Sequence, residues 1–451
     1  MMANEFWCKK SLSSKEGIAL SFLDRDISYK DLDNLVTDFS GVLKKLNLKN
    51  RLVYLPMSHD LNSVVRYLSC LQEKFIPILL PPTLEKGLKL SLQKLYKPGV
   101  VFAEGDLDNI KISNQSEVIK INSKTAILLS TSGSTGSPKL VRLSYKNISS
   151  NASSIIQYLN ISASDKALCT LPLSYSYGLS VLNSHLSAGG CTYLLDSSPF
   201  DTEFYEIIEQ KGISSICGVP FFYQMLSRTG FLNKNFSSLK VLTQAGGRMA
   251  EKLAIKFHEY STKKNLKFFI MYGQTEASAR ISYVPSESLS CKYNSIGVPI
   301  PGGELSLAED NELIYSGPNV MLGYAENISD LSLGDMNNGK LLTGDIARVD
   351  QDGFYYVIGR KKRFVKIAGS RFSLDEVETA LEKEFNSPFL VVGEDDKLSI
   401  NFESVDLQNE QIYDFLSSKF FLKRNFILLK QIQEIPYTQT GKKNYLSFQK
   451  L

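Results

Sequence analysis

The sequence predicts an α/β protein with a large N-terminal domain and a small C-terminal domain. Strand-like and helix-like segments alternate from residue 126 to 271, which is typical of mainly parallel sheets with helices packed on them. Short strands and turns dominate after residue 281, and a new helix and strand pattern begins beyond the basic run 360–363. The 451 residues suit two or three domains.

We therefore expect an N-terminal domain over residues 1–360, with parallel-rich sheets, packed helices and a β-rich subdomain at 281–358. A small, mobile α+β domain is expected over residues 361–451. Ser144 is placed to cap one helix, and Ser373 with Glu376 forms a capping-box pattern for another. Strands are expected at 76–80, 126–129, 167–171, 191–195, 213–219, 239–243, 267–271, 388–392, 398–402 and 426–429, and further helices at 179–187 and 203–210.

Bulk properties indicate an ordinary soluble enzyme. Hydrophobic residues are 43% and charged residues 22%, and the net charge of +4 is too weak to indicate a nucleic-acid partner. The six cysteines are scattered without a C-x-x-C pair, so we expect buried, reduced thiols rather than a disulfide frame or zinc site. The three histidines lie far apart and are expected to be structural. No signal core or membrane-length apolar run is present, which predicts a cytoplasmic protein without a membrane span.

The most informative segment is Thr131-Ser132-Gly133-Ser134-Thr135-Gly136-Ser137-Pro138-Lys139. It lies between an expected strand and an expected helix, where many N–H and O–H donors can face one anion. Lys139 adds a positive charge, so a nucleotide phosphate is the first ligand to consider. The segment is neither a Walker A loop nor a Rossmann fingerprint, because the required Gly-Lys-Ser/Thr order and third glycine are missing. The alternative is a flexible Ser/Gly turn.

This loop resembles the signature of the AMP-forming adenylating enzymes, which include acyl-CoA synthetases, adenylation domains of peptide synthetases and luciferases. Further segments resemble the later signatures of that superfamily and occur in the same order. They are Met271-Tyr272-Gly273-Gln274-Thr275-Glu276-Ala277, Thr343-Gly344-Asp345 with Gly359-Arg360, Lys366-Ile367-Ala368-Gly369, and Thr440-Gly441-Lys442.

The resemblance implies that ATP and Mg²⁺ are the cofactors and that a carboxylate attacks the α-phosphate of ATP. This step gives an acyl-adenylate and pyrophosphate, and a thiol then displaces AMP. Two anions must meet, so positive and donor groups carry the catalysis. The implied nucleotide-site residues are Thr131, Ser132, Gly133, Ser134, Thr135, Gly136 and Lys139 for the β- and γ-phosphates, Thr275 for the α-phosphate, Gly246, Gly247, Tyr272 and Gly273 around adenine, and Asp345 with Arg360 at the ribose.

Glu276 is the implied Mg²⁺ ligand, since this hard cation takes one or two carboxylates besides phosphate oxygens. Plainer interpretations exist for several of these residues. Glu276 can be an acid at a helix N-terminus, Asp345 a turn residue, and the glycine pair at 246–247 a tight turn.

The small domain is implied to act twice. Lys442 would bridge the carboxylate and the α-phosphate during adenylation, although alone it would be a solvated surface lysine. Lys362 would be the hinge, and rotation would then bring the Lys366–Gly369 segment to the site, with Gly369 lining the path of the thiol. The alternative for the basic run and Lys366 is a nucleic-acid patch.

One segment departs from the family pattern. Tyr175 stands where a histidine is common in the substrate-pocket motif, next to Tyr177 and Gly178. No acidic residue occurs from 171 to 185, whereas relatives that activate α-amino acids place a carboxylate there to hold the amine. This departure predicts a substrate without an α-amine.

The sequence thus predicts an acid–thiol ligase that loads a carboxylic acid onto CoA or a carrier-protein phosphopantetheine. A stand-alone amino-acid adenylation protein is the first alternative. A catalytically inactive nucleotide-binding scaffold is the second, which the joint presence of Lys139, Glu276, Asp345, Arg360 and Lys442 disfavours.

Overall fold

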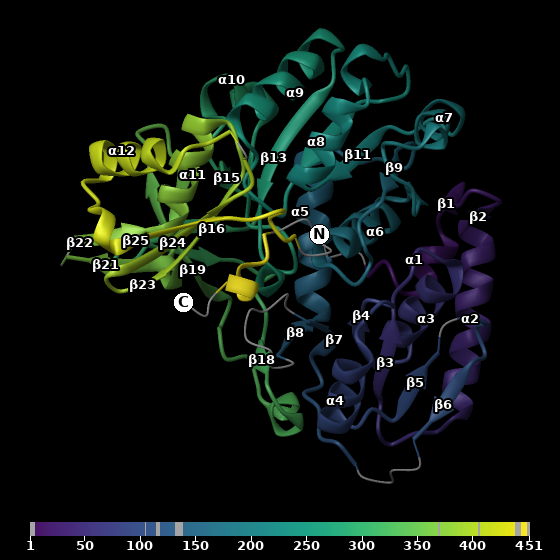
Figure 1. The fold of residues 1–451 in the computed structure, drawn as a ribbon. Helices are drawn as coiled ribbons and strands as arrows, with labels where there is room; N and C mark the ends of the chain where they lie inside the picture. The colour runs from purple at the N-terminus through teal and green to yellow at the C-terminus, as the bar shows by residue number, and fades with distance from the viewer. Residues whose placement is uncertain are drawn as a thin grey trace. The chain divides into compact units, whose positions relative to one another are not determined.

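The computed structural model describes residues 5–103, 105–113, 118–130, 139–368, 370–404, 406–437 and 443–448 (Figure 1). The chain divides into two compact units, which are described separately. The first unit is Met1–Glu304 with Tyr315–Leu341, and the second is Leu305–Ile314 with Leu342–Leu451. The second unit therefore begins earlier in the chain than residue 361, where the sequence places the small domain.

A nine-stranded sheet forms one half of the first unit. Its strands are β1 (Ile18–Ser21), β2 (Asp26–Ser28), β9 (Lys166–Cys169), β10 (Cys191–Leu194), β11 (Ser215–Gly218), β12 (Val241–Gln244), β13 (Lys267–Tyr272), β14 (Ser282–Val284) and β15 (Val298–Pro299). Their order is β15-β14-β13-β12-β11-β9-β10-β1-β2. The strands from β13 to β1 run parallel, and antiparallel strands complete both edges. The parallel-rich sheet predicted from the sequence is confirmed.

A seven-stranded sheet forms the other half of the first unit. It contains β3 (Leu52–Pro56), β4 (Ile76–Leu80), β5 (Val100–Phe102), β6 (Ile110–Ile112), β7 (Thr125–Ser130), β8 (Leu140–Ser144) and β18 (Gly323–Ala325), in the order β18-β8-β7-β4-β3-β5-β6. Strands β7, β4, β3 and β5 are parallel. Every residue of β3 and β4 is buried, as expected for parallel strands that are covered on both faces.

Helices α5 and α6 link the two sheets. The helices of the first unit are α1 (Lys9–Ser13), α2 (Tyr29–Lys45), α3 (Leu61–Gln72), α4 (Lys86–Tyr96), α5 (Tyr145–Leu159), α6 (Ser176–Ala188), α7 (Thr202–Gln210), α8 (Pro220–Arg228), α9 (Glu251–Lys263) and α10 (Leu289–Lys292), with short 3₁₀ turns η1 (Phe231–Asn233), η2 (Thr275–Ala277), η3 (Ser286–Ser288) and η4 (Ile328–Ser332). Helix α5 packs on β7 and β8, α6 packs on β9 and β10, and the two helices pack on each other. Ser144 caps α5 as predicted, by accepting a hydrogen bond from the Asn147 amide.

The segment after the Gly/Ser/Thr loop corrects one expectation. The loop was expected to lead into a helix, but residues 140–144 form β8, which pairs antiparallel with β7 from Ser130↔Leu140 to Thr125↔Ser144. All five residues of β8 are buried, so this short run fills a sheet position between β7 and β18. A helix N-terminus therefore does not directly follow the loop, and its dipole is not available there for an anion.

The second unit holds a four-stranded sheet and a smaller α+β assembly. The sheet is β16 (Glu304–Leu307), β17 (Glu312–Ser316), β19 (Lys340–Val349) and β20 (Tyr355–Arg360), and the assembly contains β21 (Phe364–Ile367), β22 (Ser370–Ser373), α11 (Leu374–Phe385), β23 (Phe389–Glu394), β24 (Lys397–Phe402), α12 (Asn409–Phe420) and β25 (Ile427–Gln431), with turns η5 (Lys361–Arg363), η6 (Arg424–Phe426) and η7 (Tyr445–Phe448). The strands within 281–358 thus divide among three sheets, because β14 and β15 join the nine-stranded sheet and β18 joins the seven-stranded sheet.

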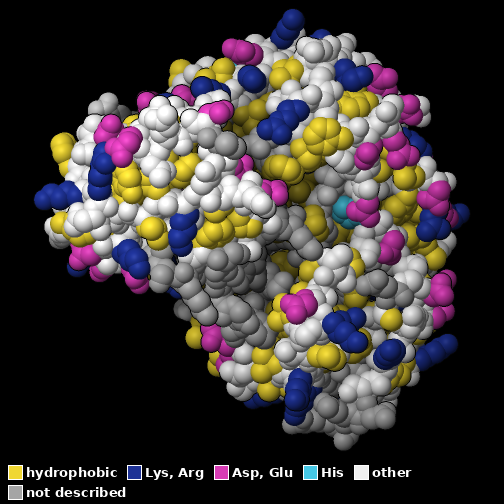
Figure 2. Space-filling view, viewed as in Figure 1, with side chains coloured by type: hydrophobic (Ala, Val, Ile, Leu, Met, Phe, Trp, Pro, Cys, Tyr) yellow, Lys and Arg dark blue, Asp and Glu magenta, His cyan; other side chains and the backbone are white. Residues whose placement is uncertain are grey.

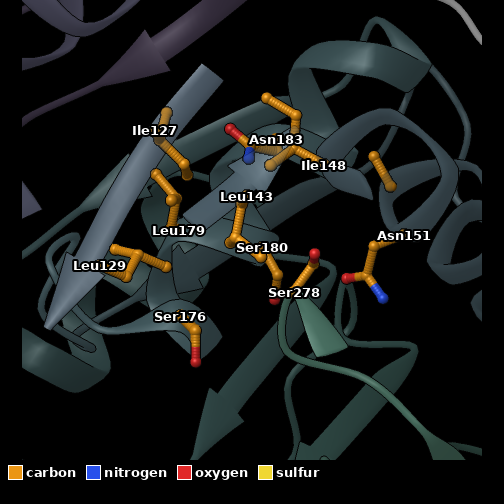
Figure 3. A pocket seen from close by; sticks show the side chains of 11 residues that line it. Ile127, Leu129, Leu143, Ile148, Asn151, Ser176, Leu179, Ser180, Asn183 and Ser278 are labelled. Carbon is orange, nitrogen blue, oxygen red and sulfur yellow. The ribbon is translucent and has the colours of Figure 1, made fainter. Parts of the chain in front are cut away.

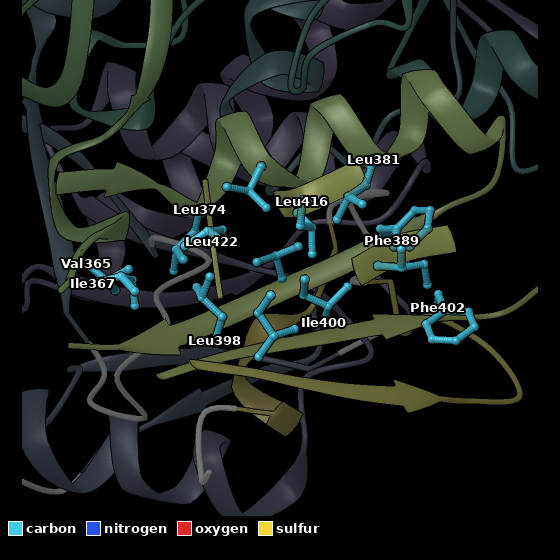
Figure 4. Close-up of a cluster of buried hydrophobic side chains, with 14 residues drawn as sticks. Val365, Ile367, Leu374, Leu381, Phe389, Leu398, Ile400, Phe402, Leu416 and Leu422 are labelled. Carbon is cyan, nitrogen blue, oxygen red and sulfur yellow. The ribbon is translucent and has the colours of Figure 1, made fainter. Parts of the chain in front are cut away.

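A hydrophobic core holds the α+β assembly together (Figure 4). Leu374 and Leu381 on α11 face side chains of β23 and β24 across this core, to which Val377 also belongs. Ser373 caps α11, since its hydroxyl accepts a hydrogen bond from the Glu376 amide at 3.3 Å. On the other face of β23, Leu390 and Val392 form a smaller cluster. The alternation of the two clusters along β23 follows the two-residue period of a strand.

The surface carries side chains of both charges, and the cysteines are not paired. Basic and acidic side chains are interspersed on the face drawn in Figure 2. Within the described ranges, no helix is both long and apolar enough to cross a bilayer. All six cysteines are free thiols; Cys291 is exposed and Cys8 partly buried, so the expectation of burial holds only for the other four.

Candidate active site

The predicted phosphate-binding loop is represented in the described residues only by its last member, Lys139. Its other predicted members lie outside them: Thr131, Ser132, Gly133, Ser134, Thr135 and Gly136. Lys139 immediately precedes β8. Its Nζ lies 3.4 Å from the centroid of the Tyr324 ring and 3.3 Å from Oε1 of Glu326. A third of the Lys139 side chain is exposed, so the ammonium group remains accessible to a further anion.

Tyr324 joins Lys139 to the predicted metal ligand. Strand β18 pairs antiparallel with β8, which places Tyr324 opposite Val141 and close to Lys139. The Tyr324 hydroxyl donates a hydrogen bond to Oε1 of Glu276 at 2.8 Å. Two residues that are 137 positions apart, Lys139 and Glu276, therefore contact one aromatic side chain. We name these three residues the phosphate–metal cluster.

Arg142 fixes the strand that carries Tyr324. This arginine is fully buried, and its guanidinium donates to the carbonyl oxygens of Tyr324, Leu322, Leu333 and Gly334. Burial lowers the pKa of Arg142, and the acidic side chains at 330 and 335 oppose that effect. Four carbonyl acceptors satisfy the buried cation and hold the 322–334 segment against β8.

The second signature forms a tight turn between β13 and β14. Gly273 has no room for a side chain, because an added Cβ would overlap the carbonyl oxygen of Ala279. Ser278 and Ala279 have φ angles of 55° and 111°, a left-handed region that is unusual for residues with a Cβ. The Met321 amide donates to the Glu276 carbonyl at 2.8 Å, which ties the turn to the segment before β18. Backbone strain is thus concentrated directly after Thr275 and Glu276.

Tyr272 and Thr275 have partners close by. The amide of Gln274 donates to the Tyr272 hydroxyl at 3.0 Å, and Tyr272 is half-buried at the end of β13. Thr275 Oγ1 lies 3.2 Å from Ser176 Oγ, at the start of α6. The nucleotide signature and the predicted substrate-pocket motif therefore meet at this pair of hydroxyls.

The pocket motif begins helix α6. The Tyr177 hydroxyl donates to the Thr243 carbonyl at 3.0 Å, and Tyr177 is buried. Gly178 is required by packing, because a Cβ would lie 2.6 Å from the Leu171 carbonyl oxygen. Gly246 has a φ of 87°, and its Cβ would lie 2.7 Å from the Tyr175 hydroxyl. Gly246 thus lets the Tyr175 ring approach the loop after β12, a role that the sequence did not reveal. The next residue, Gly247, lies against Pro220.

A small cavity lies between α5, α6 and strands β7 and β8 (Figure 3). Its volume of about 10 Å³ suits roughly one water molecule. Ser176, Ser180, Asn183, Asn151 and Ser278 supply its polar lining. The Oδ1 atom of Asn151 is buried without a partner among the described residues, so a water here would have an acceptor to bind. The cavity is too small for an acid substrate.

The second unit carries the predicted ribose residues. Asp345 on β19 is opposite Arg360 on β20, and Arg360 Nε lies 2.7 Å from Asp345 Oδ1. The Asp345 side chain is 2% exposed, whereas that of Arg360 is 54% exposed. Gly344 has a φ of 73° and donates its amide to Glu312 Oε1 at 3.0 Å. The structure therefore places a buried carboxylate beside an accessible guanidinium.

The remaining predicted residues lie around β21 or outside the described residues. Lys362 is exposed in turn η5, and Lys366 is exposed on β21, where its amide donates to Asp395 Oδ1 at 2.8 Å. Lys361, which the sequence did not single out, pairs with Asp310 and Glu312 at 2.7 Å each. Gly369 and Lys442 lie outside the described residues.

His185 and His59 both have hydrogen-bond partners inside the protein. His185 is buried, and its Nδ1 lies 2.9 Å from the Val181 carbonyl. His59 Nε2 lies 2.8 Å from the Leu171 carbonyl, and Nδ1 lies 2.6 Å from Asp196 Oδ1. Burial alone lowers the pKa of His59, but the Asp196 carboxylate, with Cys169 and the Leu171 carbonyl, outweighs it and raises the pKa to about 9.

The donor set fits a Mg²⁺ ion that is held mainly by phosphates. Glu276 is a half-buried carboxylate with one oxygen bound by Tyr324. Groups of three or more His, Cys, Asp or Glu side chains suited to a metal are absent from the part of the chain that the structure describes. Mg²⁺ often takes one or two carboxylates and completes its octahedron with phosphate oxygens and water, so one glutamate is sufficient.

The chain thus combines a mixed α/β fold with a lysine, a tyrosine and a carboxylate in one cluster, groups that suit a nucleotide phosphate and Mg²⁺. The family described as "AMP-binding enzyme" matches residues 82–325, more than half of the chain. The protein belongs to this family, which confirms the predicted membership of the AMP-forming adenylating enzymes.

Known relatives are CoA ligases. The chain is 29% identical over 266 residues to feruloyl-CoA synthase of Amycolatopsis sp, covering 56% of this chain and 53% of that protein, so it spans about half of that relative's length. It is 28% identical over 411 residues to 2-succinylbenzoate–CoA ligase of Bacillus pumilus, covering 84% and 83% of the two chains.

Solved structures support the fold over nearly the whole chain. The o-succinylbenzoate CoA synthetase of Bacillus subtilis in complex with its acyl-adenylate intermediate has a TM-score of 0.80 at 21% identity, covering 98% of this chain and 97% of the other. The same enzyme in complex with ATP and magnesium ion has a TM-score of 0.79 at 20% identity, with 98% of both chains covered. The predicted fold class is confirmed, and that complex contains both predicted cofactors.

Proposed function

We propose that this protein is an ATP-dependent acid–thiol ligase. It adenylates a carboxylic acid with release of pyrophosphate and transfers the acyl group to the thiol of CoA or of a carrier-protein phosphopantetheine. The observation that carries this proposal is the phosphate–metal cluster, in which the Tyr324 ring contacts Lys139 and its hydroxyl binds Glu276. Membership of the AMP-binding family supports it.

The first half-reaction needs groups that reduce the repulsion between two anions. Lys139 is suited to bind the β- and γ-phosphates, because its ammonium is partly exposed and its present neighbours, Tyr324 and Glu326, leave donors available. Glu276 would hold Mg²⁺, which supplies further positive charge when bound. Thr275 would donate its hydroxyl to the α-phosphate, from a position fixed beside Ser176. The acid oxygen bonds to the α-phosphorus, and pyrophosphate leaves.

Asp345 and Arg360 are suited to the ribose. A buried carboxylate beside a guanidinium is an acceptor for hydroxyl groups, as in other ribose sites. Arg360 keeps more than half of its side chain exposed and can add a contact to a phosphate or to the ribose. Tyr272, Gly246 and Gly247 would contact the adenine.

The second half-reaction would use the other face of the C-terminal domain. The thiol sulfur bonds to the acyl carbon, the bond to the AMP oxygen breaks, and the thiol proton is released. Lys442 would leave the site after adenylation, Lys362 would act as the hinge, and the Lys366–Gly369 segment would approach. The domain boundaries, 1–360 and 361–451, are part of this proposal. Support comes from the order of the motifs.

The acid is proposed to lack an α-amine. Residues 171–185 contain no Asp or Glu, and their polar atoms are hydroxyls, an asparagine and the imidazole of His185, which is already hydrogen-bonded. An α-ammonium group placed there would lose its hydration without gaining a counter-ion, which costs several kcal/mol in a buried site. Hydroxy, fatty and aryl acids therefore fit better than amino acids.

ATP–pyrophosphate exchange tests the proposal. Purified protein is incubated with ATP, labelled pyrophosphate and a panel of carboxylic acids, with and without Mg²⁺. Label should enter ATP only when Mg²⁺ and a suitable acid are both present. Tight ATP binding without exchange for any acid would instead indicate the nucleotide-binding scaffold, and a clear preference for an α-amino acid would indicate the amino-acid adenylation protein. CoA and a phosphopantetheinylated carrier are then compared as acceptors.

A further inference from the structure

Arg280 is a buried arginine that the proposed reaction has not used. It follows the second signature directly and is 2% exposed. Its guanidinium carbon lies 4.1 Å from the centroid of the Tyr177 ring. The Nε atom is buried, and within the described ranges it has no hydrogen-bond acceptor. No carboxylate among those residues forms an ion pair with Arg280, in contrast to Arg360 and Arg363.

Arg142 shows how this protein satisfies a buried arginine that serves structure. Arg142 is fully buried, and four main-chain carbonyl oxygens accept its N–H groups. Arg280 is buried almost as completely, yet its guanidinium has the Tyr177 ring and the Tyr158 hydroxyl as neighbours, and its Nε atom has no acceptor among the described residues. A buried charge without a counter-ion is costly, by several kcal/mol, and a missing ion or ligand is one of the common reasons for it.

The surroundings of Arg280 are the predicted acid pocket. Burial raises the pKa of Tyr175, Tyr177 and Tyr158, and the positive charge of Arg280 opposes the rise in all three. Tyr175 and Tyr177 belong to the pocket motif at the start of α6. The Ser176–Thr275 contact brings that motif against the signature turn from which Arg280 extends. Arg280 therefore lies among aromatic rings at the junction of the nucleotide and acid segments.

The chemistry of the reaction limits which anion can be the partner of Arg280. The carboxylate that reacts becomes a neutral mixed anhydride, so it would leave the buried guanidinium without a counter-ion after the first step. The phosphates of ATP have their own cation at Lys139, which lies on Tyr324 and not among the pocket tyrosines. A group that stays negative throughout the reaction, on the acid itself, would neutralise Arg280 in every state. A guanidinium pairs best with a carboxylate, through two parallel hydrogen bonds.

We propose that Arg280 determines specificity by binding a second carboxylate of the substrate, so that the preferred acids are dicarboxylic acids. This inference rests on the proposed ligase function and names the substrate class of the same site. Tyr177 would support the guanidinium from one face through the cation–π contact and leave its N–H edge for the carboxylate.

The test compares dicarboxylic acids with their monoamides, and variants of Arg280 with a control variant of another arginine. Short aliphatic and aryl dicarboxylic acids are paired with their monoamides, which keep the shape and lose one charge. Exchange with wild-type protein should favour the dicarboxylic acids by about 10²-fold or more in kcat/KM, the range expected when one partner of a buried charge pair is removed. Arg280→Gln should bring that ratio close to one with the KM for ATP unchanged. Arg280→Lys should retain part of the preference.

Arg348→Gln is the control, because Arg348 also stacks on a tyrosine, at 4.2 Å from Tyr356, but is exposed. It should keep the wild-type preference. Thermal unfolding of each variant verifies that it is folded. A wild-type preference for the monoamides, or a preference that survives in Arg280→Gln, would overturn the inference. A raised KM for ATP in Arg280→Gln would assign the arginine to the nucleotide and overturn it as well.

Direct binding separates this inference from the proposed function. Calorimetric titration of the dicarboxylic acids, without ATP, should show binding to wild-type protein and to Arg348→Gln but not to Arg280→Gln. If no acid supports exchange, the ligase proposal fails, and this titration still decides whether Arg280 binds dicarboxylates. Equal binding by wild type and Arg280→Gln, or binding by neither, would contradict the inference.

Discussion

The phosphate–metal cluster and the charged cluster around Glu378 differ in how completely their charges are paired. In the first unit, Lys139 is one-third exposed, and Glu276 is half-buried with a tyrosine hydroxyl as a partner. In the second unit, the Glu378 side chain is 8% exposed and accepts hydrogen bonds from Lys443, Tyr445, Arg363 and the Val391 amide.

The Glu378 cluster has the properties of a structural element. Lys443 Nζ has three acceptors, one oxygen each of Glu378, Glu382 and the Phe389 carbonyl, at 2.6, 2.6 and 2.7 Å. Burial alone lowers the pKa of Lys443, but the two carboxylates outweigh it and raise the pKa. This saturation leaves nothing for a ligand. In the phosphate–metal cluster, which we propose binds ligands, the charges are incompletely paired, whereas the charges of the Glu378 cluster are buried and saturated.

The largest expected effect comes from breaking the saturated cluster. Glu378→Gln should lower the free energy of unfolding by about 3–5 kcal/mol, because Lys443 and Arg363 would remain buried without their shared carboxylate. Urea unfolding, with hydrogen exchange of the α11 amides, measures the loss. Glu394→Gln, an exposed glutamate on β23, is the control and should stay within about 0.5 kcal/mol of wild type. Equal stabilities for the two variants would show that the Glu378 cluster does not stabilise the fold.

Removing the carboxylate of the phosphate–metal cluster should lower activity and leave stability almost unchanged, the opposite of what is expected for Glu378. Glu276→Gln should reduce the exchange rate by about 10²–10³, the cost of losing one preorganised electrostatic group, and should change stability little. Glu287→Gln, an exposed glutamate after β14, serves as the matched control. Exchange is measured over a range of Mg²⁺ concentrations. Wild-type activity for Glu276→Gln would exclude Glu276 as the metal ligand.

Tyr324→Phe should show a smaller effect of the same kind. The ring would still support Lys139, but Glu276 would lose a hydrogen bond to a charged group, worth roughly 1.5–3 kcal/mol. We expect exchange to fall roughly tenfold to hundredfold, with a higher requirement for Mg²⁺. Tyr356→Phe removes a similar hydroxyl–carboxylate bond to Asp350, at 2.9 Å in the second unit, and should leave exchange unchanged. An equal loss in both variants would indicate a general effect on folding.

The His59–Asp196 pair is expected to have the smallest effect on the free energy of unfolding. It tests whether a pair with one buried and one exposed member contributes to folding. His59 is buried, but Asp196 is 80% exposed. The pKa of His59 is raised in the folded state, so protonation stabilises the fold fully below about pH 6.5, and this contribution is lost as the pH rises through about 9. Screening of the exposed carboxylate limits the change to about 1 kcal/mol.

Urea unfolding between pH 6 and 10 measures this change. Asp196→Asn should flatten the dependence, and the exchange rate at a fixed pH should be unaffected. A pH profile of stability that is identical in wild type and Asp196→Asn would show that the pair does not contribute.

The sequence predicted those features that depend on local patterns. The cap at Ser144, the buried strand β4 and the parallel strands of the nine-stranded sheet follow from residue spacing. Strand β8 was missed, because residues 140–144 show no clear period in the sequence. They form a strand through their pairing with β7 and with β18. The order of motifs assigned Asp345 and Arg360 to one ligand, the ribose, but their ion pair is visible only in the structure.

Tyr324 and Arg280 could not be found from the sequence. Tyr324 reaches Glu276 because β18 pairs with β8, which lies far earlier in the chain, and such long-range register has no local signal. Arg280 follows a recognised signature, but a charged residue before β14 resembles an ordinary surface position. Its burial against Tyr177 depends on the tight turn at Gly273, Ser278 and Ala279, which is visible only in three dimensions.

The most direct test of the proposed reaction follows an oxygen atom. An acid that supports exchange is labelled with ¹⁸O in its carboxylate and incubated with the protein, ATP, Mg²⁺ and CoA. Attack of the carboxylate on the α-phosphate followed by thiol transfer leaves one ¹⁸O atom in AMP, which mass spectrometry detects. Our account predicts labelled AMP and unlabelled pyrophosphate. Formation of ADP with ¹⁸O in inorganic phosphate, or of AMP without label, would contradict it.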